Sequence, residues 1–290
     1  MKIQYLGTAA AEGYPALFCE CENCTKAKKL GGKNIRSRSQ ALIDDKLLID
    51  YNADTNLHYL THKFDLPNIK HCLITHGHHD HFYPMDLLAR SGPVNSHLKN
   101  NSPTYFYSPK DVYDRIIKIK ESDNIKDIDL IAVKVEPYKT YTVGEYLVTP
   151  LPAVHAGYNV SNDDGNVKFK YYPVTYIIEK DGKSMLYHHD SDFYADETFE
   201  FLKNRKKPFD LVSFDCTNGL LPKTYVGHLG LKECVDYKNE FIKNGLATDK
   251  TIFVVNHFSH NGTGSVYDDM KITAEKVGFI ARYDGMTLEF

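Results

Sequence analysis

Short apolar runs recur along the chain and are bounded by turn residues, a pattern typical of β-strands. Runs rich in Ile, Leu, Val, Tyr and Phe predict strands at residues 2–7, twice within 41–50, and at 71–75, 104–107, 146–151, 174–179, 184–188, 210–215, 251–256 and 278–283. Between them, apolar residues at helical spacing predict helices at residues 84–90, 110–120, 195–205, 230–245 and 265–278. The polar stretch at 161–170 predicts a surface loop or hairpin tip. Strands that alternate with helices predict layered α/β packing.

The composition is that of an ordinary globular protein. The 290 residues are 42% hydrophobic and 25% charged, which allows a sizeable core in one large domain or two small ones. The net charge of −3, with Lys and Arg mixed among Asp and Glu, argues against a nucleic-acid partner. No run approaches the roughly 20 apolar residues that span a bilayer, and the first residues lack the pattern of a signal peptide. We therefore expect a cytoplasmic protein with no membrane partner.

The strongest chemical signal is THGHHDH, residues 75–81, which directly follows the strand predicted at 71–75. It places His76, His78, Asp80 and His81 within six residues. Imidazole and carboxylate groups are ligands for Zn²⁺, Mn²⁺ or Fe, and four of them so close together suit two adjacent metals rather than one. His79 is interpreted as a spacer that points away.

Two adjacent metals need further ligands from elsewhere in the chain. His155, Asp190 and His257 each follow a predicted strand, in the segments PLPAVHAG, MLYHHDSD and VVNHFSH. A lone histidine is more often structural than a ligand, but three such residues in order after the first motif favour a shared site.

These motifs resemble the ordered motifs of the metallo-β-lactamase superfamily of dinuclear metal hydrolases, over essentially the whole chain. The resemblance implies a single domain at residues 1–290 with a four-layer αββα sandwich, of the α/β (α+β) class, and metals at one edge between the sheets. It implies one metal on His76, His78 and His155, a second on Asp80, His81 and His257, and Asp190 bridging them. The family's Asp-x-Gly corresponds here to LLIDYNAD, residues 47–54, which has Asp50 but no glycine two residues on.

Three cysteines, Cys19, Cys21 and Cys24, lie within the six residues of CECENC at positions 19–24. In a reducing compartment such spacing indicates metal ligands rather than disulfides. His260 is left over if His257 points into the active site, and it completes a Cys₃His set for one structural Zn²⁺. Such a site would connect this N-terminal cysteine-rich loop to the loop of His257. Cys72, Cys216 and Cys234 are predicted to be core residues.

The cysteine site and the closing segment YDGMTLEF, residues 283–290, resemble the phosphoribosyl 1,2-cyclic phosphate phosphodiesterases of the carbon–phosphorus lyase pathway of phosphonate metabolism. This resemblance implies a small phosphodiester substrate. In that group a histidine at the position of His228, in VGHLGL, acts on the substrate, and many relatives form homodimers. A phosphodiester hydrolase needs such a group to protonate the leaving alkoxide.

We therefore expect a dinuclear-metal phosphodiesterase that opens a cyclic ribose phosphate through a hydroxide bridging two ions of Zn²⁺, Mn²⁺ or Fe. His228 would be the acid, and Asp80 would also help orient the nucleophile. Asp215 either orients an imidazole or caps a turn. Of His188 and His189 at most one faces the metals, since side chains alternate along a strand. His189 would contact substrate or lie at the surface. Segments 157–170 and 93–104 are expected to rim the site.

Three alternatives remain open. A lactonase, thioesterase or β-lactamase-like hydrolase carries similar ligands. A transfer-RNA 3′-processing endonuclease would carry a basic arm, which the sequence lacks. A non-enzymatic relative of the pyrroloquinoline-quinone-biosynthesis type shares the fold and a cysteine site, but such relatives tend to lose ligands that are intact here.

Overall fold

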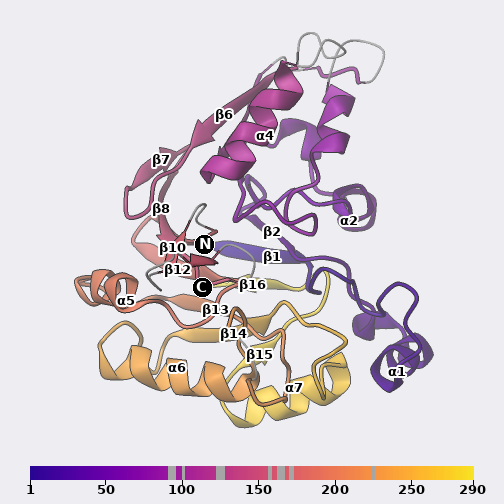
Figure 1. Ribbon diagram of the computed structural model, residues 1–290, viewed down its shortest axis with the longest axis vertical. Coiled ribbons are helices and arrows are strands. Elements are labelled where there is room, and N and C mark those ends of the chain that lie inside the picture. Colours follow the sequence, from indigo (N-terminus) through magenta and orange to yellow (C-terminus); the bar gives the residue numbers. More distant parts are fainter. Residues whose placement is uncertain are drawn as a thin grey trace.

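Two β-sheets packed face to face form the centre of the molecule (Figure 1). The computed structural model describes residues 1–90, 96–99, 102–121, 128–155, 159–161, 167–169, 173–223 and 226–290. The first sheet has the order β16 (Thr287–Glu289), β1 (Lys2–Gly7), β2 (Gln40–Ile43), β3 (Leu47–Ile49), β4 (His71–Leu73), β5 (Thr104–Ser108) and β6 (Leu130–Lys134). The second has the order β15 (Ile280–Ala281), β14 (Ile252–Asn256), β13 (Leu211–Asp215), β12 (Lys183–His188), β11 (Val174–Lys180), β8 (Tyr146–Pro152) and β7 (Tyr141–Val143).

Helices cover the outer face of each sheet (Figure 1). Over the first sheet lie α2 (Thr55–His62), α4 (Lys110–Lys120) and the 3₁₀ turns η2 (Leu66–Asn68) and η3 (Pro84–Arg90). Over the second lie α5 (Asp196–Lys203), α6 (Leu231–Lys243) and α7 (Tyr267–Lys276). Beside the sandwich is α1 (Glu22–Leu30), followed by η1 (Gly32–Asn34). None of the helices in the described ranges has the length and hydropathy needed to cross a bilayer.

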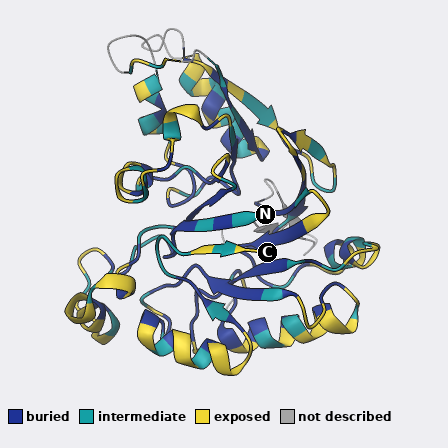
Figure 2. Cartoon of the chain, turned by 180° about the vertical axis from the view of Figure 1, so that it is seen from behind, coloured by how far each residue is buried: buried dark blue, intermediate teal, exposed yellow. Residues whose placement is uncertain are grey.

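The alternation of side chains along each strand produces separate apolar cores. Leu47 and Ile49 of β3 face the second sheet, whereas Leu48 packs outward against the helices over the first sheet. On β13, Leu211 joins the core between the sheets, and Val212 and its outward neighbours pack under α6 and α7. Figure 2 shows the consequence, buried strands between helices whose outer faces are exposed. Three apolar interfaces separate four layers, so the predicted αββα sandwich is confirmed.

Most of the predicted elements are present, with differences at weakly patterned segments. The predicted helix at 84–90 is the 3₁₀ turn η3, and the predicted strand at 278–283 is reduced to the two residues of β15. The stretch 161–170 belongs to an antiparallel pair, β9 (Asn159–Ser161) and β10 (Val167–Phe169), whose tip lies outside the described residues. Helix α1 was not predicted, because its sequence ENCTKAKKL is polar and buries only Cys24 and Ala27. Nor were α2, β6, β7 and β16.

The sandwich is also connected through a buried hydroxyl group. Tyr176 of β11, in the second sheet, donates a hydrogen bond of 2.7 Å to the carbonyl oxygen of Ile74. Ile74 follows β4 of the first sheet and immediately precedes the histidine motif at residues 75–81. The start of that motif is therefore held against both sheets.

Candidate metal centre

The histidine motif forms a tight loop at the end of β4. The backbone amides of His81 and Phe82 both donate to the carbonyl oxygen of His78, at 3.0 and 2.8 Å. His76, Asp80 and His81 are buried and His78 is half-buried, whereas His79 is exposed. The loop therefore turns four of its five ionisable side chains toward one place, and His79 points away as expected.

The first group of side chains brings His76, His78, His155 and Asp190 together, with one ligand atom of each within 4.8 Å of the others. His78 Nδ1 lies 3.0 Å from His76 Nε2 and 3.1 Å from His155 Nε2. A ring nitrogen carries at most one proton, so hydrogen bonds among three converging imidazoles cannot satisfy all of them. A cation that accepts a lone pair from each ring fits this arrangement.

The second group brings Asp80, His81, Asp190 and His257 together, again within 4.8 Å. Asp190 Oδ2 lies 2.8 Å from His81 Nε2, and Asp190 Oδ1 lies 3.0 Å from His257 Nε2. The same Oδ2 atom is 3.2 Å from His76 Nε2 of the first group. Asp190 therefore belongs to both groups, in the position that a bridging ligand would occupy.

Three residues at or beside the centre adopt left-handed backbone conformations within two residues of a strand end. The φ angles are +66° at Asp50, +49° at Asp190 and +62° at His257. Such values are uncommon for residues other than glycine and are found where the surrounding structure enforces them. At Asp50 this conformation turns the chain away from the end of β3.

A second layer of side chains orients the ring nitrogens. Asp50 is fully buried, and its carboxylate accepts the backbone amide of Thr75 at 2.8 Å and lies 2.7 Å from His81 Nδ1. The hydroxyl of Thr217 lies 2.8 Å from His257 Nδ1. Because a carboxylate or hydroxyl on Nδ1 fixes the orientation and tautomer of the ring, Nε2 of both histidines is directed to the centre.

The charges of the centre depend on its buried carboxylates. Burial opposes ionisation of Asp190, but His257 and His81 hold the pKa of its carboxyl well below the usual range. In return, although burial acts against it, Asp190 raises the pKa of His257 to about 10. Burial instead lowers the pKa of His76 well below its usual range. A divalent cation would take the place of the protons that these carboxylates attract.

Unsatisfied atoms provide a further test of whether metals fit. Among the described residues, His81 Nε2, His257 Nε2 and Asp190 Oδ1 are buried and form no hydrogen bond of acceptable geometry. Buried polar atoms without partners are costly, and they recur at sites that hold ions. The donor set of imidazoles and carboxylates, together with these atoms, fits two divalent ions.

His228 lies beside both groups, in front of Asp215. Its Nδ1 is 2.9 Å from Asp215 Oδ2 and 3.6 Å from Asp190 Oδ1. Asp215 also accepts the backbone amides of Thr217 and Leu229, so it orients an imidazole and closes a turn at once. Burial opposes protonation of His228, but the Asp215 carboxylate raises the pKa of the imidazole above its usual value.

The two histidines before Asp190 do not reach the centre. His188 is buried among the rings of Tyr194, Phe214 and Tyr237, under α6. His189 points to the opposite side, where its Nε2 lies 2.7 Å from the hydroxyl of Ser213. Strand alternation separates the two as expected, but the suggestion that His189 is a surface residue is wrong, since the ring is 1% exposed.

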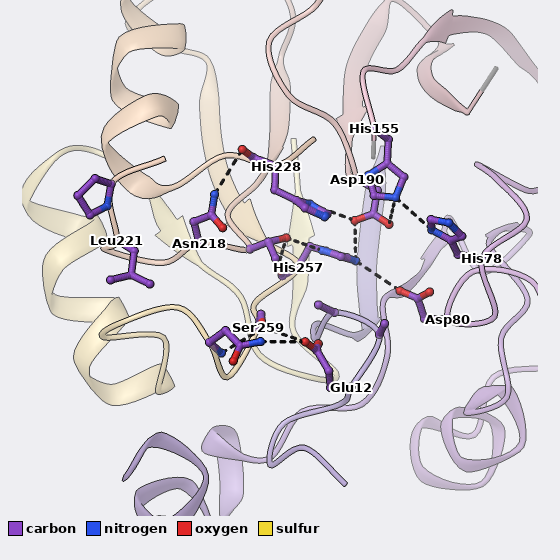
Figure 3. A pocket seen from close by; sticks show the side chains of 15 residues that line it. Glu12, His78, Asp80, His155, Asp190, Asn218, Leu221, His228, His257 and Ser259 are labelled. Atoms are coloured by element: carbon purple, nitrogen blue, oxygen red, sulfur yellow. Dashed lines mark hydrogen bonds and ion pairs between the residues drawn. The ribbon is translucent and has the colours of Figure 1, made fainter. Parts of the chain in front are cut away.

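A pocket of about 500 Å³ opens onto the centre. Figure 3 shows His155, Asp190 and His228 on one side of it, with Glu12 and Ser259 on the other. Asn218, Leu221 and Pro222 close a third side. The pocket therefore exposes one edge of the centre to a small ligand. The expected rim at 157–170 lies mostly outside the described residues. Of the expected rim at 93–104, Ser96, Leu98 and Thr104 line a different pocket beside Tyr51 and Phe106, and no described residue of this segment lines the pocket at the centre.

The cysteines at residues 19–24 meet His260 at the far end of the His257 loop. One ligand atom each of Cys19, Cys21, Cys24 and His260 lies within 4.8 Å of the others. His260 Nδ1 is 3.3 Å from Cys19 Sγ and 3.6 Å from Cys21 Sγ. Burial opposes ionisation, but the contact with His260 lowers the pKa of the Cys21 thiol to about 6. The other cysteines, Cys72, Cys216 and Cys234, are buried in the cores.

The structure brings together the side chains that the sequence singled out for these groups. Of the residues that orient them, the sequence analysis named Asp215 but not Thr217. Asp50 had a signal, because it ends a predicted strand in the position of the related Asp-x-Gly. Thr217 and Glu12 had none, because hydroxyl and carboxyl side chains in loops are common at any surface.

Comparison with known proteins is consistent with this geometry. Curated proteins gave no match. Among solved structures, a diphosphatase from the PhnP family aligns with 19% identity and a TM-score of 0.71, covering 100% of this chain and 97% of the other. Zn²⁺-bound PqqB from Methylobacterium extorquens aligns with 17% identity and a TM-score of 0.67, covering 100% of both chains. The short form of human tRNase Z aligns with 15% identity and a TM-score of 0.64, covering 100% and 99%.

At these identities the solved structures establish a shared fold. A family model described as a beta-lactamase superfamily domain matches residues 47–244, which include the histidine motif, His155, Asp190 and His228. The match extends over more than half of the chain. The chain is therefore a member of the beta-lactamase superfamily.

Proposed function

We propose that this protein is a metal-dependent phosphodiesterase that hydrolyses a small cyclic ribose phosphodiester. The observation that carries the proposal is the placement of Asp190 between two complete ligand groups, with His228 and Asp215 alongside. His76, His78 and His155 would hold one ion, Asp80, His81 and His257 the other, and Asp190 both. When bound, two divalent ions of Zn²⁺, Mn²⁺ or Fe would activate a water molecule and offset phosphate charge.

The side chains of the pocket have separate roles in this reaction. Asp80 lines the pocket as well as the second group, and its carboxylate would orient the attacking water toward phosphorus. His228 would protonate the departing alkoxide. With Nδ1–H donated to Asp215 at 2.9 Å, the proton would leave from Nε2. A protonated imidazole suits this role, and the Asp215 carboxylate favours it.

Two further features support a phosphodiester over a lactone or thioester. The Cys₃His group resembles that of the cyclic phosphate phosphodiesterases, and we propose that it holds one structural Zn²⁺ that joins the N-terminal segment to the His257 loop. Asn23 strengthens this junction by donating to the carbonyl oxygens of His260 and Gly262, at 2.9 and 3.1 Å. One of the structural relatives is described as a diphosphatase, which is an enzyme for a phosphate substrate.

The direct test is hydrolysis by chelator-treated protein reloaded with Mn²⁺ or Zn²⁺. Ribose 1,2-cyclic phosphate, with and without a 5-phosphate, is compared with a lactone and a thioester. We expect metal-dependent opening of a cyclic phosphate and little turnover of either ester. Turnover of an ester alone would show that the proposed reaction is wrong although the metals are bound.

Replacing His228 with alanine should lower kcat by about 10²- to 10⁴-fold, because the leaving alkoxide loses its proton donor. Metal content, measured by elemental analysis, should stay unchanged. His79→Ala is the matched control, since it removes an exposed imidazole from the adjacent motif. Loss of metal from His228→Ala, or full activity, would contradict the acid role.

Replacing Asp50 with asparagine should weaken metal binding by about 10- to 100-fold, because His81 loses the carboxylate that orients it. Affinity is measured by competition with a chromogenic chelator. Asp181→Asn, in an exposed turn with a similar positive φ, controls for the loss of one charge. Equal affinity of the two variants would exclude an orienting role for Asp50.

Cys24→Ser should remove one equivalent of zinc per chain, because a tetrahedral site loses a thiolate, and should lower the thermal midpoint. The metals of the dinuclear centre should remain. Cys72→Ala removes a buried thiol elsewhere and should retain all the zinc. If Cys24→Ser keeps the same metal content as Cys72→Ala, the Cys₃His site is not a zinc site.

A further inference from the structure

One side of the pocket carries a carboxylate that belongs to neither ligand group of the dinuclear centre. Glu12 lines the pocket together with Ser259 and Asn261 (Figure 3). Its Oε1 atom accepts hydrogen bonds from the hydroxyl of Ser259 at 3.2 Å and from the side-chain amide of Asn261 at 3.3 Å. The backbone amide of Asn261 in turn donates to the Ser259 hydroxyl at 3.1 Å. The three side chains form one hydrogen-bonded unit.

This unit is held by the two segments that meet at the cysteine site. Phe258 forms two backbone hydrogen bonds with the N-terminal segment: Ala10 N donates to Phe258 O, and Phe258 N donates to Thr8 O, both at 3.0 Å. His260 Nε2 lies 3.8 Å from Glu12 Oε1. Glu12 is therefore positioned from both sides of the junction rather than on a loose loop.

The other carboxylate oxygen of Glu12 has no partner. Within the described part of the chain, Glu12 Oε2 is buried and accepts no hydrogen bond. A buried acceptor without a donor is costly, and a ligand that brings a donor would be favoured there. The side chain as a whole is 35% exposed and lines the pocket, but Oε2 itself is covered, so a ligand would have to draw this oxygen toward the pocket.

The charge of the pocket indicates which donor fits. Its described lining contains the carboxylates of Glu12, Asp80 and Asp190 but no Lys or Arg. Two of these carboxylates would be occupied by the dinuclear centre, which leaves Glu12 as a negative charge facing the ligand. A hydroxyl group can donate to this oxygen, whereas a phosphate monoester would bring charge of the same sign.

We propose that Glu12, supported by Ser259 and Asn261, binds a hydroxyl group of the substrate's sugar and selects against a second phosphate on it. This inference rests on the proposed phosphodiesterase function and specifies the substrate as a cyclic phosphodiester of an otherwise unphosphorylated, hydroxyl-bearing sugar. Nucleotide-binding proteins use the same chemistry where a carboxylate accepts the ribose 2′-hydroxyl and excludes a 2′-phosphate.

The test compares kcat/KM for ribose 1,2-cyclic phosphate with that for its 5-phosphorylated form, using metal-loaded protein. We expect the wild type to prefer the unphosphorylated substrate. Glu12→Gln keeps the acceptor for Ser259 and Asn261 but removes the charge, so the ratio should shift toward the 5-phosphate by about tenfold or more. Glu197→Gln, at an exposed position in α5, should leave the ratio unchanged.

A second readout is independent of turnover. Calorimetry with ribose 1-phosphate and ribose 1,5-bisphosphate should show the same shift in relative affinity for Glu12→Gln, with unchanged zinc content. An unchanged ratio in both experiments would overturn the proposal. So would loss of zinc from Glu12→Gln with the ratio unchanged, because Glu12 would then serve only to position His260.

The two proposals fail in distinguishable ways. If the wild type opens neither cyclic phosphate, the phosphodiesterase function is wrong, and the calorimetric comparison still decides whether Glu12 selects against a second phosphate. If the wild type opens both and prefers the 5-phosphate, the phosphodiesterase function stands and the role of Glu12 is wrong.

Discussion

The placement of one buried carboxylate, that of Asp190, determines how the rest of the centre is arranged. Its two oxygens lie within 3.2 Å of ring nitrogens from His76, His81 and His257, which come from both sheets of the sandwich. Removing an ionised carboxylate from water is unfavourable unless positive charge surrounds it. The surrounding imidazoles, and the cations they are suited to bind, meet that requirement. The sandwich can therefore be understood as a frame that brings ligands from the ends of separate strands to this carboxylate.

The supporting residues extend this arrangement outward. Asp50 and Thr217 each fix one imidazole, and Asp215 fixes His228 while closing its own turn. The cysteine group plays a comparable part at a distance, because it joins residues 19–24 to the loop that carries His257. The segment from His257 to Asn261 thus contributes to the candidate metal centre, the cysteine group and the pocket wall within five residues. A substitution in any one of these three regions is therefore expected to alter the geometry of the other two.

The sequence reveals those features whose residues lie close together along the chain. The motif at residues 75–81 places four metal-binding side chains within six residues, far more than a random segment of that length would contain. Short apolar runs likewise reveal most of the strands. Helix α1 could not be found this way, because its sequence is polar, only Cys24 and Ala27 are buried, and its N-cap is a cysteine, Cys21. The role of Glu12 was equally invisible, since it depends on Ser259 and Asn261, about 250 residues away in the chain. Long-range contacts of single polar residues leave no periodic pattern.

The left-handed conformations at Asp50, Asp190 and His257 restrict which amino acids evolution or design can place there. Among residues other than glycine, Asn, Asp and His tolerate positive φ best. Glycine would relax the backbone but provide no side chain. Glu, Cys or a β-branched residue would change the ligand chemistry and would also strain the backbone. Few amino acids are therefore tolerated at these three positions. The tolerated ones, Asn, Asp and His, carry oxygen or imidazole groups that can bind metals. Diversification of this scaffold should consequently proceed through the pocket walls, where the backbone imposes no such limit.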